Sequence, residues 1–285
     1  MTNASTRTMG SILSTCLVGA VTLTASTLTA RVASADDDPF EVRWELDVPL
    51  GAAAALAGGS MHLLQDELVA ERCGLDCDPN RVNAFDATTL GTYSEAASIG
   101  GNVLVTANVV LGPTVALISA IDADHPDRFM HFAEDVTLLG QTLGLSVFVH
   151  QLTAFATQRP RPYVYASSLS PALRDDANSY LSFYSGHTAN GFAVATATSY
   201  LFMRRNPESP WVVPLWTMSH GLAALQGYLR VASGFHYWSD VLVGAAMGSA
   251  LGLAVPWLHE LPDSEIALTP MPLRGGAALA VSWHR

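Results

Sequence analysis

The chain has 285 residues, a formal net charge of −11 and a mean hydropathy of +0.27, and charged residues make up only 14% of it. Charged residues make up about 25% of an average soluble domain, so much of this surface is predicted to face lipid rather than water. The 14 Lys and Arg residues form no basic cluster. This excludes a nucleic-acid partner, because binding a phosphate backbone requires a basic stripe.

The N-terminal residues are typical of an export signal. Arg7 precedes a long uncharged run, and small residues at 33–35 lie directly before three aspartates. An uncleaved anchor helix is the alternative interpretation. The predicted domains are a signal peptide (1–35), a helical domain (36–261) and a C-terminal extension (262–285).

Helices are predicted for six apolar stretches, near 48–64, 96–121, 129–157, 180–203, 211–229 and 239–258. The predicted fold is therefore all-α, a bundle of about six apolar helices largely embedded in a membrane. The second stretch exceeds the roughly 20 residues that cross a bilayer, and the sixth is rich in small residues that let helices pack closely in lipid. The third carries Glu134, Asp135 and His150, and the first ends in acidic residues. These two are the weaker spanning candidates.

Two cysteines remain once the predicted signal is removed. Cys73 and Cys77 lie four residues apart in a polar stretch, and two close cysteines in an exported protein are predicted to form a disulfide. Free thiols or half of a metal site are the alternatives. No metal site is predicted, because no second cysteine pair accompanies them.

The tail from residue 262 differs in character from the apolar stretches. Pro and Gly residues there separate short alternating runs. This pattern indicates a small hairpin or a loose extension outside the helical body.

The most informative spacing is that of His236 and Asp240, which are four residues apart. On a helical turn, this spacing lets the carboxylate accept one ring N–H and leaves the other ring nitrogen free as a nucleophile or base. For the pair alone, the alternative is an aspartate that caps a helix beside a histidine with satisfied hydrogen bonds.

An anion-binding site is predicted at the neighbouring helix ends. Arg230 ends an apolar helix, where an unpaired guanidinium would be costly. Ser185, Gly186 and His187 open another helix, whose first N–H groups favour an oxyanion. Ser185 is also a candidate N-cap residue.

Two further arginines lie in a proline-restricted loop. Arg159 and Arg161 belong to the sequence QRPRP, and extended arginines suit bidentate phosphate binding. Such a segment is also typical of a basic membrane flank or a linker.

Together these stretches resemble the type 2 phosphatidic acid phosphatase superfamily, which includes bacterial acid phosphatases and vanadium haloperoxidases. The family pattern is Lys-x6-Arg-Pro, then Pro-Ser-Gly-His, then Ser-Arg-x5-His-x3-Asp, and the resemblance covers residues from about 130 to 258. It implies that His236 is the nucleophile, that Asp240 orients it and that His187 protonates the leaving group. It implies that the phosphate oxygens are held by Arg161, Arg230, Ser185 and Gly186, without a metal or other cofactor.

The chain departs from this pattern at three positions. Ala154 stands in place of the lysine, Tyr184 in place of the motif proline and Leu229 in place of the motif serine. The last two changes alter shape rather than charge. For the missing lysine, the hypothesis is that Arg159 partly substitutes.

The predicted function is that of a metal-independent phosphatase acting on a phosphomonoester or diphosphate, with a membrane lipid as substrate, through a phosphohistidine. The alternatives are a soluble periplasmic acid phosphatase or phosphotransferase, and a non-catalytic membrane protein that retains the phosphate pocket. The predicted location is the bacterial inner membrane, with the site facing the periplasm. That orientation requires that one of the first three stretches does not cross, that none of them crosses, or that the N-terminus stays in the cytoplasm. The first stretch is predicted not to cross, because it is short and ends in acidic residues.

Overall fold

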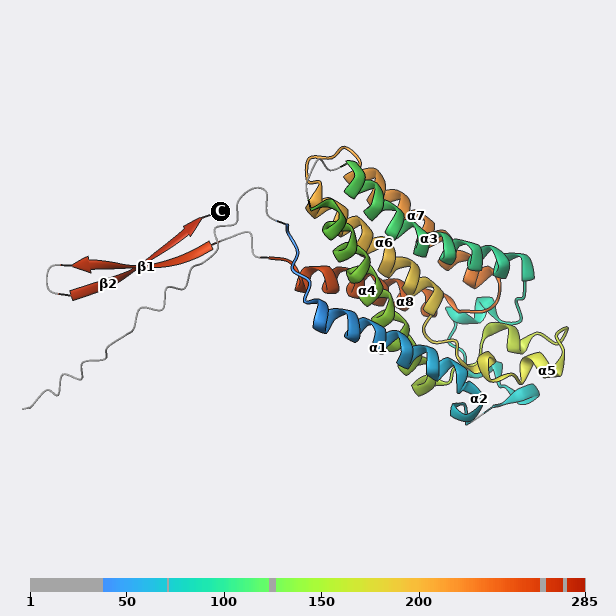
Figure 1. The fold of residues 1–285 in the computed structure, drawn as a ribbon. Helices are drawn as coiled ribbons and strands as arrows, with labels where there is room; N and C mark the ends of the chain where they lie inside the picture. Colours follow the sequence, from blue (N-terminus) through green and yellow to red (C-terminus); the bar gives the residue numbers. More distant parts are fainter. Residues whose placement is uncertain (1–37, 71, 123–126, 262–264, 274–275, 285) are drawn as a thin grey trace, which may run out of the picture. The chain divides into compact units, whose positions relative to one another are not determined.

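A computed structural model describes residues 38–70, 72–122, 127–261, 265–273 and 276–284 (Figure 1). The predicted signal peptide lies outside the described residues. Described residues between Asp38 and Leu261 form one compact unit, and those after residue 264 belong to a second.

Six long helices form the first unit, and each corresponds to a predicted apolar stretch, which confirms the all-α prediction. They are α1 (Trp44–Leu63), α3 (Glu95–Asp122), α4 (Arg128–Thr157), α6 (Gly186–Arg205), α7 (Val212–Ala232) and α8 (Trp238–Leu258). The short connecting helices are α2 (Gln65–Leu68), α5 (Pro171–Arg174), η1 (Gly74–Asp76), η2 (Pro79–Arg81), η3 (Asp86–Thr89), η4 (Pro162–Tyr165) and η5 (Ala177–Tyr180). The five η elements are 3₁₀ helices.

Helix α8 packs very closely against α6 through glycines at every fourth position. A Cβ atom added at Gly248 would lie 2.1 Å from the carbonyl oxygen of Ala189. One at Gly244 would lie 2.7 Å from the carbonyl oxygen of Ser185, just before α6, and one at Gly252 would lie 2.4 Å from that of Ala193. The small residues noted in the sequence therefore bring the two backbones together, as in many membrane helix pairs.

Helix α1 lies along α4 and runs in the same direction. Gly51 packs on Gln141, and Gly58 packs on Val147 and Phe148. Because both contacts advance together along the two helices, the pair is parallel, and both helices run toward the end of the bundle where α2 follows α1.

Polar side chains also join the helices inside the bundle. Ser146 of α4 donates to Asn190 of α6 at 2.8 Å, and Asn108 of α3 donates to Gln226 of α7 at 3.0 Å. Hydrogen bonds of this kind hold helices together in lipid, where burial of apolar surface drives association less than in water.

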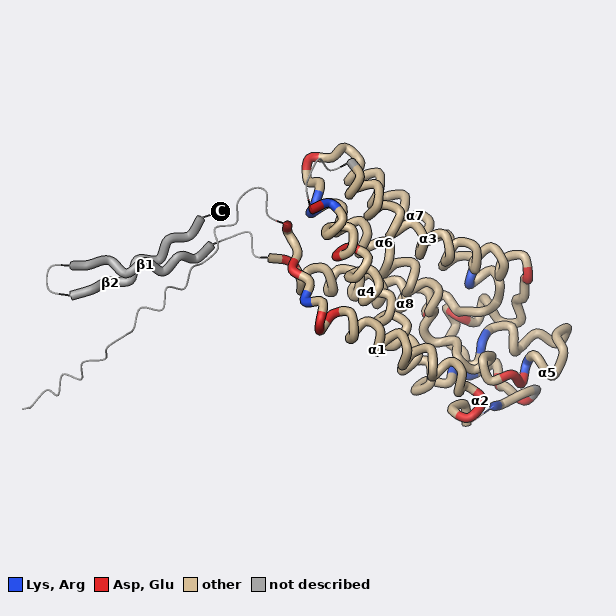
Figure 2. The backbone as a smooth tube through the Cα atoms, viewed as in Figure 1, with Lys and Arg blue, Asp and Glu red and all other residues tan. Residues whose placement is uncertain are grey.

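Three segments are long and apolar enough to cross a membrane by length and composition: Glu95–Ile121, Arg128–Tyr165 and Trp238–Leu258. Figure 2 shows that charged residues lie mainly toward the two ends of the helical body. The second segment contains the stretch 129–157 and is the least apolar of the three. Its two acidic residues lie at one end, where they are paired.

The pairing residue is Arg205, at the end of α6. Its guanidinium donates to Glu134 at 3.0 Å, to Asp135 at 2.8 Å and to Asp38 at 2.7 Å. One buried cation thus meets three carboxylates, which removes much of the cost of placing acidic residues on an apolar helix.

At this same end the chain enters and leaves the bundle. Phe40 and Glu260 form an isolated antiparallel bridge, and the N–H of Leu261 donates to the carbonyl of Pro39 at 2.9 Å. Helix α8, with its 21 residues, separates this bridge from the opposite end of the bundle by about 30 Å.

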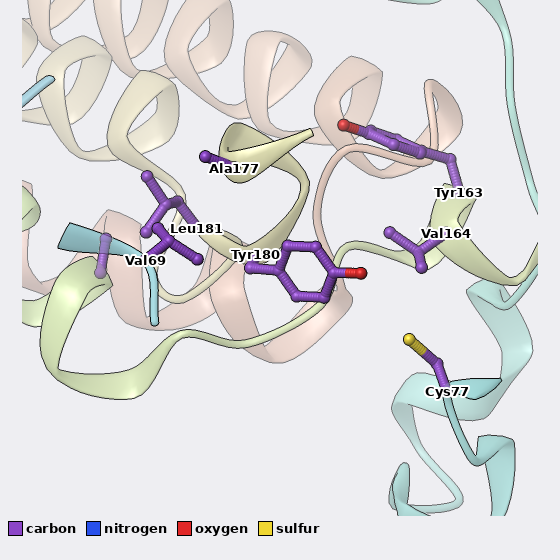
Figure 3. Packing of buried hydrophobic residues seen from close by; sticks show 8 residues of the cluster. Val69, Cys77, Tyr163, Val164, Ala177, Tyr180 and Leu181 are labelled. Atoms are coloured by element: carbon purple, nitrogen blue, oxygen red, sulfur yellow. The ribbon is translucent and has the colours of Figure 1, made fainter. Parts of the chain in front are cut away.

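At the opposite end, an apolar cluster packs beneath the connecting segments (Figure 3). Its buried members are Val69, Cys77, Ala154, Tyr163, Val164, Ala177, Tyr180 and Leu181. Cys73 and Cys77 are joined in a disulfide with a Cα–Cα distance of 4.9 Å. Within this turn the N–H of Gly74 donates to the hydroxyl of Tyr180 at 2.7 Å, so the connection from α2 to α3 is tied to the connection from α4 to α6.

The second unit contains a β-hairpin, one of the two forms predicted for the tail. Strands β1 (Glu265–Leu273) and β2 (Gly276–His284) pair antiparallel, with Glu265 opposite His284. The boundaries of the three predicted domains stay a prediction.

Gly248→Ala is expected to destabilise the bundle, because the new methyl group would overlap the Ala189 carbonyl. Overpacking of this kind costs about 1–3 kcal/mol of unfolding free energy. The control is Gly221→Ala on α7, where nothing lies within 4 Å of the added atom. Thermal unfolding in detergent should show a lower Tm for the first variant only. Equal Tm values for both would contradict the close packing of α6 and α8.

Candidate active site

The three predicted stretches meet at the end of the bundle where α4 and α7 end and α6 and α8 begin. Helix α4 ends because Gln158 adopts a left-handed conformation with φ of 42°, after which Pro160 and Pro162 cannot continue a helix. The Gln158 side chain accepts from the N–H of Ala70 at 3.2 Å and donates to the carbonyl of Leu68 at 3.1 Å. This anchors the arginine loop against the segment after α2.

Ser185 is the N-cap of α6. Its buried hydroxyl lies 3.4 Å from the N–H of Thr188 and 2.9 Å from the Thr188 hydroxyl. The hydroxyl therefore serves the cap, which was the alternative interpretation of this residue. Gly186 and His187 occupy the first turn, where backbone N–H groups have no partner within the helix and favour an anion.

A tight turn joins α7 to α8 and places His236. Gly234 has φ of +76°, and a Cβ atom there would lie 1.8 Å from the carbonyl oxygen of Thr92. Only glycine fits this conformation beside that backbone. The N–H of His236 then donates to the carbonyl of Arg230 at 3.2 Å, so the imidazole lies next to the end of α7.

The direct partner of the His236 ring differs from the one expected. Its Nδ1 donates to the carbonyl of Ser182 at 2.8 Å, whereas the nearest oxygen of Asp240 is 3.7 Å away, too far for a hydrogen bond. The expectation that Asp240 accepts the ring N–H is therefore corrected. The Ser182 carbonyl fixes the tautomer and leaves Nε2 unprotonated in the neutral ring.

Asp240 is fully buried and acts on the histidine through other groups. It accepts from the Ser182 hydroxyl at 2.6 Å, from the N–H of Tyr237 at 2.9 Å and from Arg159 at 2.6 Å. The carboxylate both caps α8 and holds the segment whose carbonyl binds His236. It is a positioning residue in this geometry.

Arg159 also differs from its expected role. Its guanidinium lies between two carboxylates, at 2.6 Å from Asp240 and 2.8 Å from Asp86, and stacks 3.9 Å above the ring of Tyr237. The hypothesis that Arg159 takes the place of the missing lysine toward phosphate does not fit this arrangement, because its charge is already paired.

Asp86 was not identified from the sequence. It is fully buried and accepts from Arg159 and from both the N–H and the hydroxyl of Ser239, at 3.0 and 2.6 Å. Although burial acts to raise it, the hydrogen bonds from Arg159 and Ser239 hold the pKa of Asp86 below its ordinary value.

Arg161 and Arg230 converge on one ring. Their guanidinium carbons lie 4.9 and 4.4 Å from the centre of Phe235, beside His236, and both side chains are buried. The Nε atoms of both arginines are buried without a hydrogen-bond partner among the described residues. Burial and then the charge of Arg161 lower the pKa of Arg230. Two like charges held together in this way favour a bound anion.

His187 faces the same two arginines. Its Nε2 lies 3.0 Å from the side-chain oxygen of Asn102, which also accepts from Arg230 at 3.2 Å. Burial and the charge of Arg230 lower the pKa of His187, and burial and the charge of Arg161 lower the pKa of His236. These shifts favour the neutral form of both histidines near pH 7.

Two other residues near the site were not assigned from the sequence. Asn102 comes from α3, which carries no other group in the predicted motifs. His150, on α4, was noted only as a polar residue within an apolar stretch, yet its ring lies against Gly186. Neither has a local sequence signal, since each contact joins distant parts of the chain.

A separate cavity of about 560 Å³ opens on the disulfide side of the arginine loop. It is lined by Cys73, Cys77, Arg81, Arg159, Tyr165 and Tyr237, among others. None of the three histidines near the site lines it. Among the described residues, no group of three His, Cys, Asp or Glu side chains is placed to hold a metal ion.

Asp86→Asn is expected to lower stability at pH 7 by about 3 kcal/mol, since it breaks a buried ion pair with Arg159. Because the folded-state pKa of Asp86 is lowered, its contribution is present above the ordinary value of 3.8 and is lost as pH falls through the lowered pKa. Thermal unfolding should therefore separate variant and parent clearly at pH 7 and less at pH 3.

The matched control is Asp76→Asn, which changes an exposed carboxylate on the same connecting segment. It should leave Tm unchanged at both pH values. A variant at position 86 that is as stable as the parent at pH 7 would contradict the role given to the ion pair.

Comparison with known proteins locates the similarity in the same region. Residues 135–262 match the family model described as the PAP2 superfamily. The lipid A 1-phosphatase of Porphyromonas gingivalis is 35% identical over 89 residues, which are 31% of this chain and 19% of that protein. The chain thus aligns with about a fifth of the length of this curated relative.

Among solved structures, the chain is similar to a transmembrane PAP2 type phosphatidylglycerolphosphate phosphatase from Bacillus subtilis. The sequence identity is 17% and the TM-score is 0.45, with 74% of this chain and 94% of that chain covered.

Proposed function

Since residues 135–262 belong to the PAP2 superfamily, we propose that this protein is a phosphatase that hydrolyses a phosphomonoester or diphosphate of a membrane lipid through a phosphohistidine. The observation that carries the proposal is the convergence of His187, His236, Arg161 and Arg230 at the helix ends.

In the proposed first step, Nε2 of His236 attacks phosphorus. The Ser182 carbonyl holds the Nδ1 proton and so directs the other nitrogen to the substrate. The bond from phosphorus to the leaving oxygen breaks, and His187 gives that oxygen a proton. In the second step, His187 takes a proton from water, which attacks phosphorus, breaks the bond to nitrogen and releases phosphate.

Charge on the transferred phosphoryl group is balanced by Arg161, Arg230 and the first N–H groups of α6. Their preorganised positions supply electrostatic stabilisation without requiring a metal ion. Arg159 has a different proposed role, because its guanidinium is paired with Asp240 and holds that carboxylate in place.

A lipid substrate is supported by the apolar exterior of the bundle. Large side chains exposed on its long helices include Leu56, Val103, Val110, Met218 and Leu242. A site at the helix ends can receive a phosphate head group while the hydrocarbon chain stays in lipid. Phosphatidic acid, phosphatidylglycerophosphate, undecaprenyl diphosphate and lipid A are the candidate substrates.

For orientation, the disulfide supports a site that faces the periplasm. Cys77 belongs to the apolar cluster beneath the site, together with Ala154 and Tyr163. Disulfides persist in oxidising compartments, so the site end of the bundle is proposed to lie on that side of the inner membrane.

His236→Ala is expected to abolish phosphate release from the preferred substrate, because no other group replaces the nucleophile. The measurement is release of inorganic phosphate by purified parent and variant from the four candidate lipids and from soluble phosphomonoesters. Equal release by both proteins would contradict the catalytic assignment. Activity only on soluble esters would favour an acid phosphatase.

His187→Ala is expected to slow hydrolysis of an alkyl phosphate by about 10²–10⁴-fold, since general acid catalysis contributes that much. An aryl phosphate with a weakly basic leaving group should be affected far less. Because the pKa of His187 is lowered below the ordinary 6.5, kcat/KM of the parent should fall as pH rises through that lowered value. The variant should not show this fall in kcat/KM. Equal slowing of the alkyl and aryl esters would rule out His187 as the general acid.

A further inference from the structure

The family pattern leaves one position of the site without a donor. Ala154 stands where the pattern has lysine, and it is fully buried in an apolar cluster beside Tyr163 and Val164. Arg159 cannot serve instead, because its guanidinium is already paired with Asp240 and Asp86. A hydrogen-bond donor from α4 to the phosphate must therefore be a residue other than Ala154.

His150 lies one helical turn before Ala154 and therefore on the same side of α4. Its ring occupies the space above Gly186, since a Cβ atom added there would lie 2.7–2.8 Å from three of its atoms. The ring also packs edge-on against Tyr184, with a centroid distance of 5.5 Å. His150 thus lies over the first turn of α6, whose N–H groups are placed to bind the anion.

The charges around His150 are those of the same site. Arg161, His187 and His236 all lie close enough to interact with it electrostatically, as does His62 at the end of α1. Its ring also makes a hydrogen bond to the backbone of Tyr184. In the interactions described for it, half-buried His150 meets the positive charge of Arg161 and no carboxylate, so a bound anion would be favoured beside it.

We propose that His150 is a third histidine of the phosphate site and donates a hydrogen bond to the substrate phosphate in place of the lysine that Ala154 replaces. A bound phosphate anion favours protonation of the ring, so that one ring nitrogen can donate to the Tyr184 carbonyl and the other to phosphate. The proposal rests on the proposed function for the identity of the anion. Its geometry rests on the contact with Gly186 and on the packing against Tyr184.

Two substitutions separate donation from packing. His150→Phe keeps an aromatic ring above Gly186 and removes the donors, whereas His150→Gln keeps two donors on a side chain without a ring. The control is His220→Phe on α7, where the histidine stacks on Trp216 at 5.1 Å and lies 3.1 Å from Thr196 rather than in the site.

The experiment is calorimetric titration of inorganic phosphate into each purified protein in detergent, with thermal unfolding to check the fold. His150→Phe is expected to weaken binding about 10- to 100-fold, the range for loss of a hydrogen bond to a charged group. His150→Gln should stay within about threefold of the parent, and His220→Phe should match the parent.

Parent-like affinity in His150→Phe would overturn the proposal, because the ring would then serve only packing. A loss in His150→Gln as large as in His150→Phe would also overturn it. Binding does not depend on turnover, so the result is separate from the proposed function. A parent that binds phosphate through His150 but releases none from any ester would leave the inference standing and refute the phosphatase assignment.

Discussion

The arrangement of the site depends on one partly buried cation between two fully buried carboxylates. Arg159 joins Asp240, at the start of α8, to Asp86, in the segment between α2 and α3. Through Asp240 it also fixes Ser182, whose carbonyl holds the ring of His236. The histidine keeps its orientation because this group of charges keeps its geometry.

The two clusters of charge at this end of the bundle are balanced in different ways. Around Arg159, two carboxylates meet one guanidinium, and hydroxyl and backbone N–H donors complete the bonding. Around Phe235, Arg161 and Arg230 meet no carboxylate in the contacts described for them, and their Nε atoms are buried without partners. Burying charges is costly unless they are paired. The first cluster therefore provides rigidity, and the second is left for the anion to complete.

Local patterns predicted what depends on local spacing. Hydrophobic runs gave the six helices, and the position of His187 at a helix start and of Arg230 at a helix end placed both residues at the same site. The predictions that were wrong concern the partners of Arg159 and His236, which depend on contacts between residues far apart in the sequence. Arg159 meets carboxylates 73 and 81 positions away, and the partner of His236 is a carbonyl 54 positions away. A His-x3-Asp spacing cannot reveal that a closer acceptor competes for the ring.

Asn102 and His150 are residues near the site that the sequence pattern did not reveal. Asn102 interacts with Arg230 across 128 positions, and a lone asparagine in an apolar helix has no pattern around it. His150 is recognisable only once the glycine beneath its ring is known. A residue that replaces a missing motif residue is therefore found from three-dimensional contacts and not from the local sequence.

The bridge between Phe40 and Glu260 has a consequence for how the chain is inserted. It brings both ends of the helical body to the side opposite the histidines, so a bundle whose six long helices all cross makes an even number of passes. A site on the oxidising side would then place Asp38 in the cytoplasm. Cleavage of an export signal just before that residue would place it outside. Since α1 runs beside α4 in the same direction, a cleaved signal and a periplasmic site exclude each other in such a bundle.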